Sequence, residues 1–253
     1  MQDISLADLL KAGAHFGHQQ SRWHPKMKPF IYTSRNGIYI IDLAKTKAQL
    51  EAAAAFVASI AERNGTVLFV GTKRQVKSII ERESKRAGLP YVVNRWIGGT
   101  FTNWPTVSKL IAKYKRLKDE RDRGEFQKYT KKERLKLEET IERTGQLVGG
   151  IENMSKLPDA IFIVDLKIER TALREAMKTN VPVIAIVDTN VDPTPIAYPI
   201  PANDDATKTL EIIITCLASE FLTGQSRAQV PVEQTESVAE PAIKDQANET
   251  KQP

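Results

Sequence analysis

Four short apolar runs, separated by segments with helical periodicity, constrain the fold of this chain more than any other feature. The runs are Val67–Val70, Tyr91–Val93, Ile161–Val164 and Val183–Val187. Strands this apolar are buried on both faces, and strands that alternate with helices pair in parallel through helical crossovers. The sequence therefore predicts an α/β domain built on a doubly wound parallel sheet with helices on both faces.

The helices expected around these strands span about 43–64, 75–87 and 170–179, and a last one runs from 206 to about 223. Nearer the start, Ser5 is expected to cap a short helix that ends near Gly13. Two β-rich runs, 30–33 and 38–41, flank Asn36-Gly37, which predicts a hairpin.

Between the second and third strands the alternation breaks. Two long segments with helical periodicity, about 104–123 and 131–153, stand where one crossover helix is expected. Narrow apolar stripes are typical of helices that pack against each other rather than inside a core. The stripes here are Leu110, Tyr114 and Leu117, then Leu137, Ile141, Val148 and Ile151. We therefore predict an inserted antiparallel α-helical coiled-coil hairpin at 104–153, with a turn near Gly124.

The positive charge of the chain is concentrated in this insertion. From Lys109 to Lys136 there are twelve Lys and Arg against five Asp and Glu, a net of +7, whereas the whole chain is +6. Pairs four residues apart, such as Lys115 with Asp119 and Lys118 with Asp122, would give an ordinary solvated surface. Because the acids are too few to neutralise the bases, contact with nucleic-acid phosphates is the favoured interpretation.

A second candidate surface is the loop 22–28, where basic residues alternate with Trp23. Such loops suit RNA, because aromatic rings and guanidinium planes stack on bases. A loop whose tryptophan packs inward fits the sequence equally well. A similar patch is expected at 94–96, at the end of the sheet. The candidate RNA-binding residues are Arg22, Trp23, Lys26, Lys28, Arg35, Arg74, Arg95, Trp96, Lys109, Lys113, Lys115, Arg116, Lys131 and Lys132.

A nucleotide-dependent enzyme is the alternative function, because doubly wound sheets often carry active sites in the loops after their strands. The loop 71–75 has one glycine where a dinucleotide loop needs three, and the loops after Val164 and Val187 have none. There is no Gly-x-Ser-x-Gly elbow. The single cysteine, Cys216, lies in an apolar stretch that predicts a buried side chain. We expect no catalytic residue and no small-molecule substrate.

A structural metal ion is the only cofactor that the spacing leaves open. The three histidines, His15, His18 and His24, fall within ten residues of sequence. A set of His18, Asp188 and Asp204 is the candidate, but the spacing matches no zinc-enzyme motif. Histidines that pack or touch RNA are the favoured alternative.

The remaining sequence sets the domain limits. Residues 225–253 have no aromatic residue and carry three bases against five acids, so we expect a disordered, mildly acidic tail. The α/β domain then comprises 1–103 and 154–224, with a loop-rich N-terminal segment at 1–42. We also expect no secretory signal, no membrane span and no intrachain disulfide, and hence a reducing, aqueous compartment.

Several longer motifs resemble those of a known family. They are Gly13–Gln19 with Trp23–Met27, Phe69–Lys73, Arg95–Asn103, Leu157–Ala160, Val187–Asn190 and Ile200–Ala206. They occur in the right order and cover about residues 1–224. On these motifs the chain is similar to the bacterial-type small-subunit ribosomal protein two family.

The resemblance implies a flavodoxin-like or Rossmann-like α/β domain with an inserted coiled coil. It further implies a place between the head and body of the small subunit, contact with small-subunit ribosomal RNA and neighbouring proteins, and help in docking ribosomal protein one. The location implied is the cytoplasm of a bacterium, with the plastid stroma as the alternative. His24 stands where many relatives carry Asn, so the resemblance gives it no metal role. The tail inherits nothing, because its length varies in the family.

Overall fold

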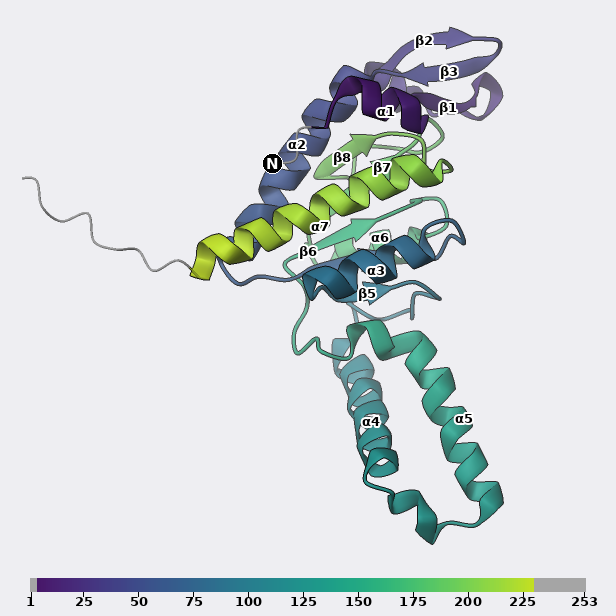
Figure 1. The fold of residues 1–253 in the computed structure, drawn as a ribbon. Helices are drawn as coiled ribbons and strands as arrows, with labels where there is room; N and C mark the ends of the chain where they lie inside the picture. The colour runs from purple at the N-terminus through teal and green to yellow at the C-terminus, as the bar shows by residue number, and fades with distance from the viewer. Residues whose placement is uncertain (1–3, 230–253) are drawn as a thin grey trace, which may run out of the picture.

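A five-stranded parallel sheet forms the middle layer of the computed structural model, which describes residues 4–229 (Figure 1). Its strands are β4 (Val67–Val70), β5 (Tyr91–Val92), β6 (Ala160–Ile163), β7 (Val183–Val187) and β8 (Tyr198–Pro201). The spatial order is β5-β4-β6-β7-β8, and all four pairings are parallel. This is the order of flavodoxin-like doubly wound sheets, and it confirms the α/β prediction.

The edge strand β8 is the element of this sheet that the apolar pattern misses. Its sequence contains Pro199 and Pro201, and proline cannot donate a ladder hydrogen bond. Such a strand is tolerated only at the edge of a sheet, which is where β8 lies, beside β7. The two prolines therefore explain why the sequence pattern did not predict this strand. They are also consistent with its position at the edge of the sheet.

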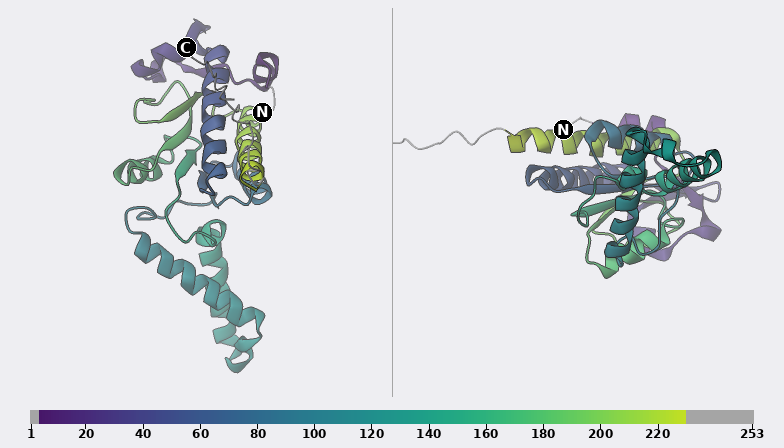
Figure 2. Two further views of the ribbon diagram at one scale, coloured as in Figure 1. Left: turned by 90° about the vertical axis from the view of Figure 1, so that its left-hand side faces the viewer. Right: turned by 90° about the horizontal axis from the view of Figure 1, so that it is seen from below.

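Helices cover both faces of the sheet (Figure 2). The first face packs against α2 (Leu43–Glu62), α3 (Lys77–Ala87) and α7 (Thr207–Gln229), and the second against α6 (Arg170–Lys178). Because side chains alternate along a strand, Phe69 and Phe162 join the first core while Leu68 and Ile161 join the second. The Phe69 and Phe162 rings lie 5.1 Å apart, centroid to centroid.

The last helix extends farther than expected. α7 continues through Gln229, past the boundary expected after residue 224. The remainder of the expected tail, 230–253, lies outside the described residues. Within the part of the chain that the structure describes, no helix is both long enough and apolar enough to span a membrane.

The N-terminal segment adds a short helix and a second, smaller sheet to the domain. α1 (Leu6–Ala12) begins at a capping box between Ser5 and Asp8. A three-stranded antiparallel sheet follows, made of β1 (Phe16–Gln19), β2 (Ile31–Arg35) and β3 (Ile38–Ile41), with 3-10 turns at 20–22 and 25–30 between β1 and β2. Asn36 and Gly37 both have positive φ, 51° and 76°, as a two-residue type I′ hairpin turn requires. The predicted hairpin of β2 and β3 is confirmed. The sequence did not predict β1, because β1 lacks alternating apolar and polar residues.

The insertion projects away from the sheet as two helices joined by a turn (Figure 1). α4 (Trp104–Asp122) leads outward, η3 (Glu125–Lys128) turns the chain, and α5 (Lys131–Val148) leads back. Leu117, Phe126 and Ile141 form a small separate core between them. α5 ends at Val148 rather than near 153, and η4 (Gly149–Ile151) returns the chain to the sheet.

Gly150 sits where the insertion meets β5. A Cβ at this position would stand 2.2 Å from the Tyr91 carbonyl oxygen and 2.8 Å from its ring. We expect Gly150→Ala to lower the free energy of unfolding by about 2 kcal/mol or more, because backbone must move to relieve the clash. Gly98→Ala is the control, since a Cβ at that position would have no neighbouring atom within 4 Å. Equal urea unfolding midpoints for the two variants would contradict this packing.

Candidate nucleic-acid interface

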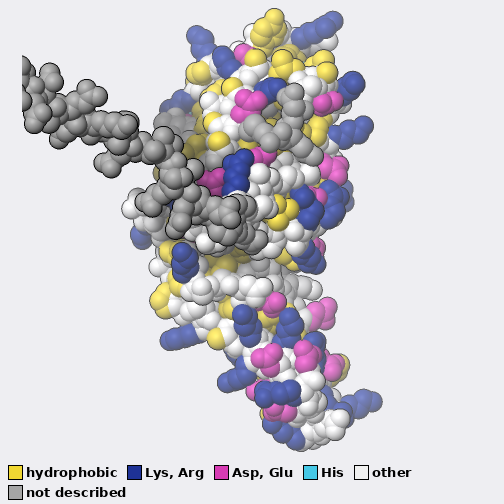
Figure 3. Space-filling model, turned by 60° about the vertical axis from the view of Figure 1, so that its left-hand side comes forward, with side chains coloured by type: hydrophobic (Ala, Val, Ile, Leu, Met, Phe, Trp, Pro, Cys, Tyr) yellow, Lys and Arg dark blue, Asp and Glu magenta, His cyan; other side chains and the backbone are white. Residues whose placement is uncertain are grey.

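The candidate bases of the insertion are exposed on α4 and α5. Figure 3 shows dark-blue Lys and Arg side chains gathered over its outer half, with magenta acids among them. Arg116 pairs with Glu120 at 3.5 Å. Within residues 4–229 the other five make no ion pair: Lys109, Lys113, Lys115, Lys131 and Lys132. These five ammonium groups are therefore available to an anionic partner.

The helical ion pairs expected from the sequence are not the ones that form. Lys118 reaches across to Glu152 at 3.3 Å instead of pairing with Asp122. Asp122 accepts from Arg121 at 2.9 Å. The reason is position: Lys118 lies half-buried beside the Tyr114 ring, 5.9 Å from its centroid, on the side of α4 that faces the returning chain. It thus ties the outgoing helix to the segment after α5.

The insertion as a whole is less basic than its central stretch. The full segment 104–153 carries thirteen bases and nine acids, a net of +4, compared with +7 for 109–136 alone. The difference arises in the returning part of the insertion, where Glu138, Glu139, Glu142 and Glu152 outnumber Arg143. The whole segment is still net positive, which favours an anionic partner.

The N-terminal loop is held against the sheet domain. The His24 amide donates to the Thr189 carbonyl at 2.8 Å, and Lys26 pairs with Asp192 at the same distance. Trp23 is half-buried, with its ring 4.9 Å from that of Tyr39. Arg22 and Lys28 are exposed. The tryptophan thus packs on a neighbouring ring, and the loop's two unengaged cations face outward.

The patch expected at 94–96 is only partly exposed. Arg95 is exposed, but Trp96 is 7% exposed and its Nε1 donates to Glu175 at 3.1 Å. A ring buried in this way has no face to offer a nucleobase. The expectation that Trp96 stacks on RNA is wrong, because the indole is part of the core beneath the insertion. The separate candidates Arg35 and Arg74 are exposed as well.

Glu175 is the central polar residue of this region, and no sequence motif singled it out. Its carboxylate is 7% exposed and accepts hydrogen bonds from the amides of Gly99 (2.7 Å), Phe101 (2.9 Å) and Thr102 (3.3 Å), as well as from Trp96. Burial opposes the charge, but these hydrogen bonds outweigh it and lower the pKa of Glu175. One carboxylate on α6 thereby fixes the segment that leads into α4.

The crevice at the ends of the parallel strands, where such sheets bind ligands, is filled by an ion-pair network. Lys73 Nζ lies 3.0 Å from Asp204 Oδ1 and 3.4 Å from Asp165 Oδ2. Burial alone would lower the pKa of Lys73, but the neighbouring carboxylates raise it above its ordinary value. Gly71 permits close packing, since a Cβ there would stand 2.6 Å from Ile80. The loop is thus built for packing and not for phosphate approach.

The candidate metal ligands do come together, but as members of this network. His18 Nδ1 lies 3.1 Å from Asp188 Oδ1, and Asp188 Oδ2 accepts the Asp204 amide at 3.4 Å. The charge of Asp204 is already matched by Lys73. Among residues 4–229, no group of three His, Cys, Asp or Glu side chains is arranged to hold a metal ion. The arrangement is an ion-paired network and does not fit a metal centre.

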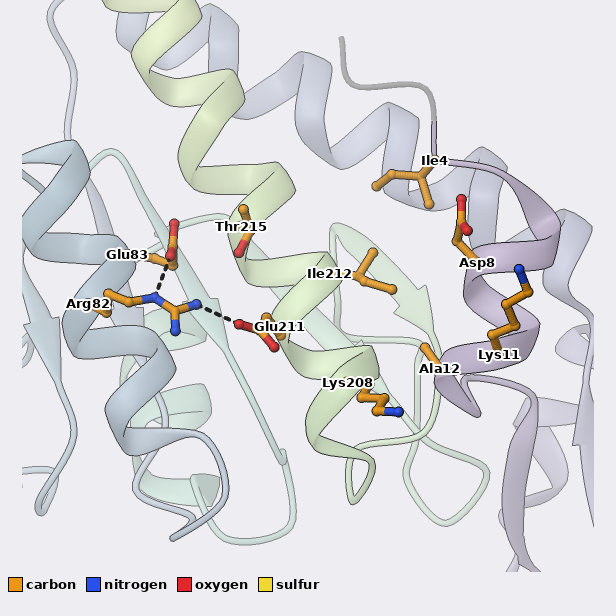
Figure 4. A pocket seen from close by; sticks show the side chains of 10 residues that line it. All are labelled: Ile4, Asp8, Lys11, Ala12, Arg82, Glu83, Lys208, Glu211, Ile212 and Thr215. Carbon is orange, nitrogen blue, oxygen red and sulfur yellow. Dashed lines mark hydrogen bonds and ion pairs between the residues drawn. The ribbon is translucent and has the colours of Figure 1, made fainter.

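An open hollow of about 900 Å³ lies between α1, α3 and α7 (Figure 4). Its Arg82 pairs with Glu83 and Glu211, each at 2.8 Å, so its central charges are neutralised within the protein. Cys216 lies elsewhere and is 3% exposed, and burial raises the pKa of its thiol to about 11. The prediction of a buried cysteine is confirmed, and the hollow holds no nucleophile paired with a base.

Comparisons with a family model and with individual proteins point to the same family. The family model described as ribosomal protein S2 matches residues 9–224. The small ribosomal subunit protein uS2 of Coprothermobacter proteolyticus is 49% identical over 229 residues, 90% of this chain and 85% of that protein. The uS2 proteins of Chloroflexus aggregans and a Roseiflexus species are 46% and 48% identical over 89% of this chain, covering 95% and 86% of their own lengths.

Removal of the Glu175 carboxylate should strongly lower the stability of the fold. Glu175→Ala leaves the part-buried amide of Gly99 and the buried amide of Phe101 without an acceptor, and we expect a loss of about 3 kcal/mol or more of unfolding free energy. Glu175→Gln should lose less, because one oxygen is retained. Glu138→Gln, at an exposed site on α5, should leave the urea midpoint unchanged. A wild-type midpoint for Glu175→Ala would contradict the anchoring role.

His18 predicts a pH dependence of stability. The Asp188 carboxylate, whose Oδ1 lies 3.1 Å from His18 Nδ1, raises the pKa of His18 above its ordinary value, although burial of the ring lowers it. A group whose folded pKa is raised stabilises the fold fully below its unfolded pKa and loses that contribution as pH rises through the folded value. The thermal midpoint should therefore fall as the pH rises from about 6.5 through the folded pKa of His18, and His18→Gln should flatten this slope. Asp188→Asn should flatten it equally, and a steeper slope in either variant would contradict the pairing.

Proposed function

This chain belongs to the ribosomal protein S2 family, and on that premise we propose that it is a structural, non-catalytic component of the small ribosomal subunit. The family match over residues 9–224 carries the proposal. The filled crevice at the strand ends supports it, because Lys73 and its carboxylate partners stand where an enzyme of this fold would bind its ligand. On this proposal the protein is located in cytoplasmic ribosomes, with plastid ribosomes as the alternative.

The partner proposed for the insertion is small-subunit ribosomal RNA. Five exposed bases without acidic partners among the described residues lie on α4 and α5, and the insertion carries a net charge of +4. Such cations gain binding free energy by releasing counterions from phosphates, without reading base sequence. The small core of Leu117, Phe126 and Ile141 supports the finer proposal that the two helices act as one coiled-coil hairpin. The outward-facing cations Arg22, Lys28, Arg35, Arg74 and Arg95 are proposed as further contacts.

A protein partner requires a different kind of surface. The three-stranded sheet exposes Phe16 (49%) and Tyr32 (76%), and aromatic side chains are enriched in protein interfaces. We assign the docking of neighbouring small-subunit proteins, ribosomal protein one among them, to this sheet. The position between head and body of the subunit belongs to the same proposal and rests on the family likeness.

The simplest test is recovery from cells. A tagged copy of the full chain should bring down complete small subunits. Recovery only as a free monomer would contradict the proposed function.

The role of the insertion is tested by charge reversal. Lys113→Glu, Arg116→Glu and Lys132→Glu combined should weaken binding to small subunits that lack this protein. The variant's log affinity should also fall less steeply with log salt, because each lost phosphate contact removes roughly 0.7–0.9 from the slope. Binding measured at several salt concentrations gives both values. Affinity and slope equal to wild type would mean that the insertion faces solvent.

A further inference from the structure

The exposed face of α6 is a second basic surface, separate from the insertion. Four exposed bases make it up: Lys167, in the loop before the helix, and then Arg170, Arg174 and Lys178 on the helix itself. The last three are spaced by four residues, so they form one row about 12 Å long on a single side of the helix. Within residues 4–229, none of the four makes an ion pair with an acid.

The acids of this segment are turned the other way. Glu169 is 3% exposed and accepts from the Thr72 amide at 3.1 Å, and Glu175 is occupied by the segment leading into α4. A twelve-residue stretch, 167–178, that is only modestly basic in sequence therefore presents four positive charges and no negative charge to solvent. This sorting by burial explains why the charge count of the sequence did not reveal the surface.

A cleft of about 260 Å³ opens beside the row, between α6 and the loop after β7. Leu166, Leu173, Val191 and Pro195 give it an apolar lining, and Lys167 and Arg170 also line it. His24 of the N-terminal loop lines it too, so the cleft joins α6 to the loop that carries Arg22 and Lys28. Asp192, the acid in the lining, is neutralised by Lys26 at 2.8 Å. The row, the cleft and the loop make one continuous surface.

We propose that the exposed face of α6 is an RNA-docking surface, in which the basic row contacts successive phosphates and the adjoining cleft accepts an unstacked base. The inference rests on the proposed function and adds a site to it. A row of cations beside an apolar cleft matches single-stranded RNA, where phosphates repeat along the strand and bases can turn outward. An acidic protein segment is the competing occupant, because Ile168 and Met177, 54% and 50% exposed, would also suit it.

The test compares two triple variants of the full chain. Arg170→Gln, Arg174→Gln and Lys178→Gln remove the row, and glutamine keeps helical propensity. The matched control, Lys11→Gln, Arg63→Gln and Lys208→Gln, makes the same charge change at exposed sites in the layer of α1, α2 and α7. Binding to small subunits that lack this protein is measured across a salt series. The α6 variant should bind more weakly, with a slope shallower by roughly 2 to 3, while the control keeps the wild-type slope.

The outcomes separate this inference from the proposed function. Failure of the wild-type chain to bind depleted subunits would overturn both. Wild-type binding with no difference between the α6 variant and the control would overturn the α6 surface alone.

A photocrosslinker, p-benzoylphenylalanine, in place of the exposed Thr171 identifies the partner in assembled subunits. Crosslinks to RNA support the proposal, whereas crosslinks confined to protein, or none, overturn it.

Discussion

The hydrogen bonds that the Glu175 carboxylate accepts fix how the insertion joins the sheet domain. The carboxylate lies on α6, inside the second core, and its oxygens accept three backbone amides and an indole from 96–102. Gly150 closes the same junction from the returning side by packing directly on Tyr91. The insertion therefore leaves the sheet at two tightly packed points. A charged extension held at its base in this way presents its cations in a fixed direction, which is what docking onto a rigid polyanion requires.

The distribution of charge follows from the same construction. In the insertion, Glu152 forms an internal pair with Lys118, while five exposed bases of α4 and α5 have no acidic partner among the described residues. On α6, the inward-facing glutamates support the fold while the outward-facing bases remain unpaired. In the crevice at the strand ends the positive charge is not free, because Lys73 pairs with several carboxylates. Positive charge is thus free at the surfaces proposed to meet RNA and neutralised where an enzyme would bind its substrate.

Much of the fold could be predicted from the sequence, because β4, β6 and β7 are apolar enough to be buried on both faces. β8 could not, since its prolines resemble a loop until the edge position is known. The site is harder to predict. The exposed bases of α4 and α5 follow from counting, but Trp96 resembles a surface residue in sequence because its partner, Glu175, lies 79 residues away. The α6 surface escapes prediction for a related reason: only burial separates its acids from its bases.

We propose that the insertion and the α6 face attach this protein to small-subunit ribosomal RNA. A cryo-electron microscopy map of small subunits purified through a tag on this chain would test both contacts at once. We expect density for the bases of α4 and α5, and for Arg170 and Arg174 on α6, against RNA phosphates. A map in which the insertion extends into solvent and α6 touches no RNA would contradict this proposal.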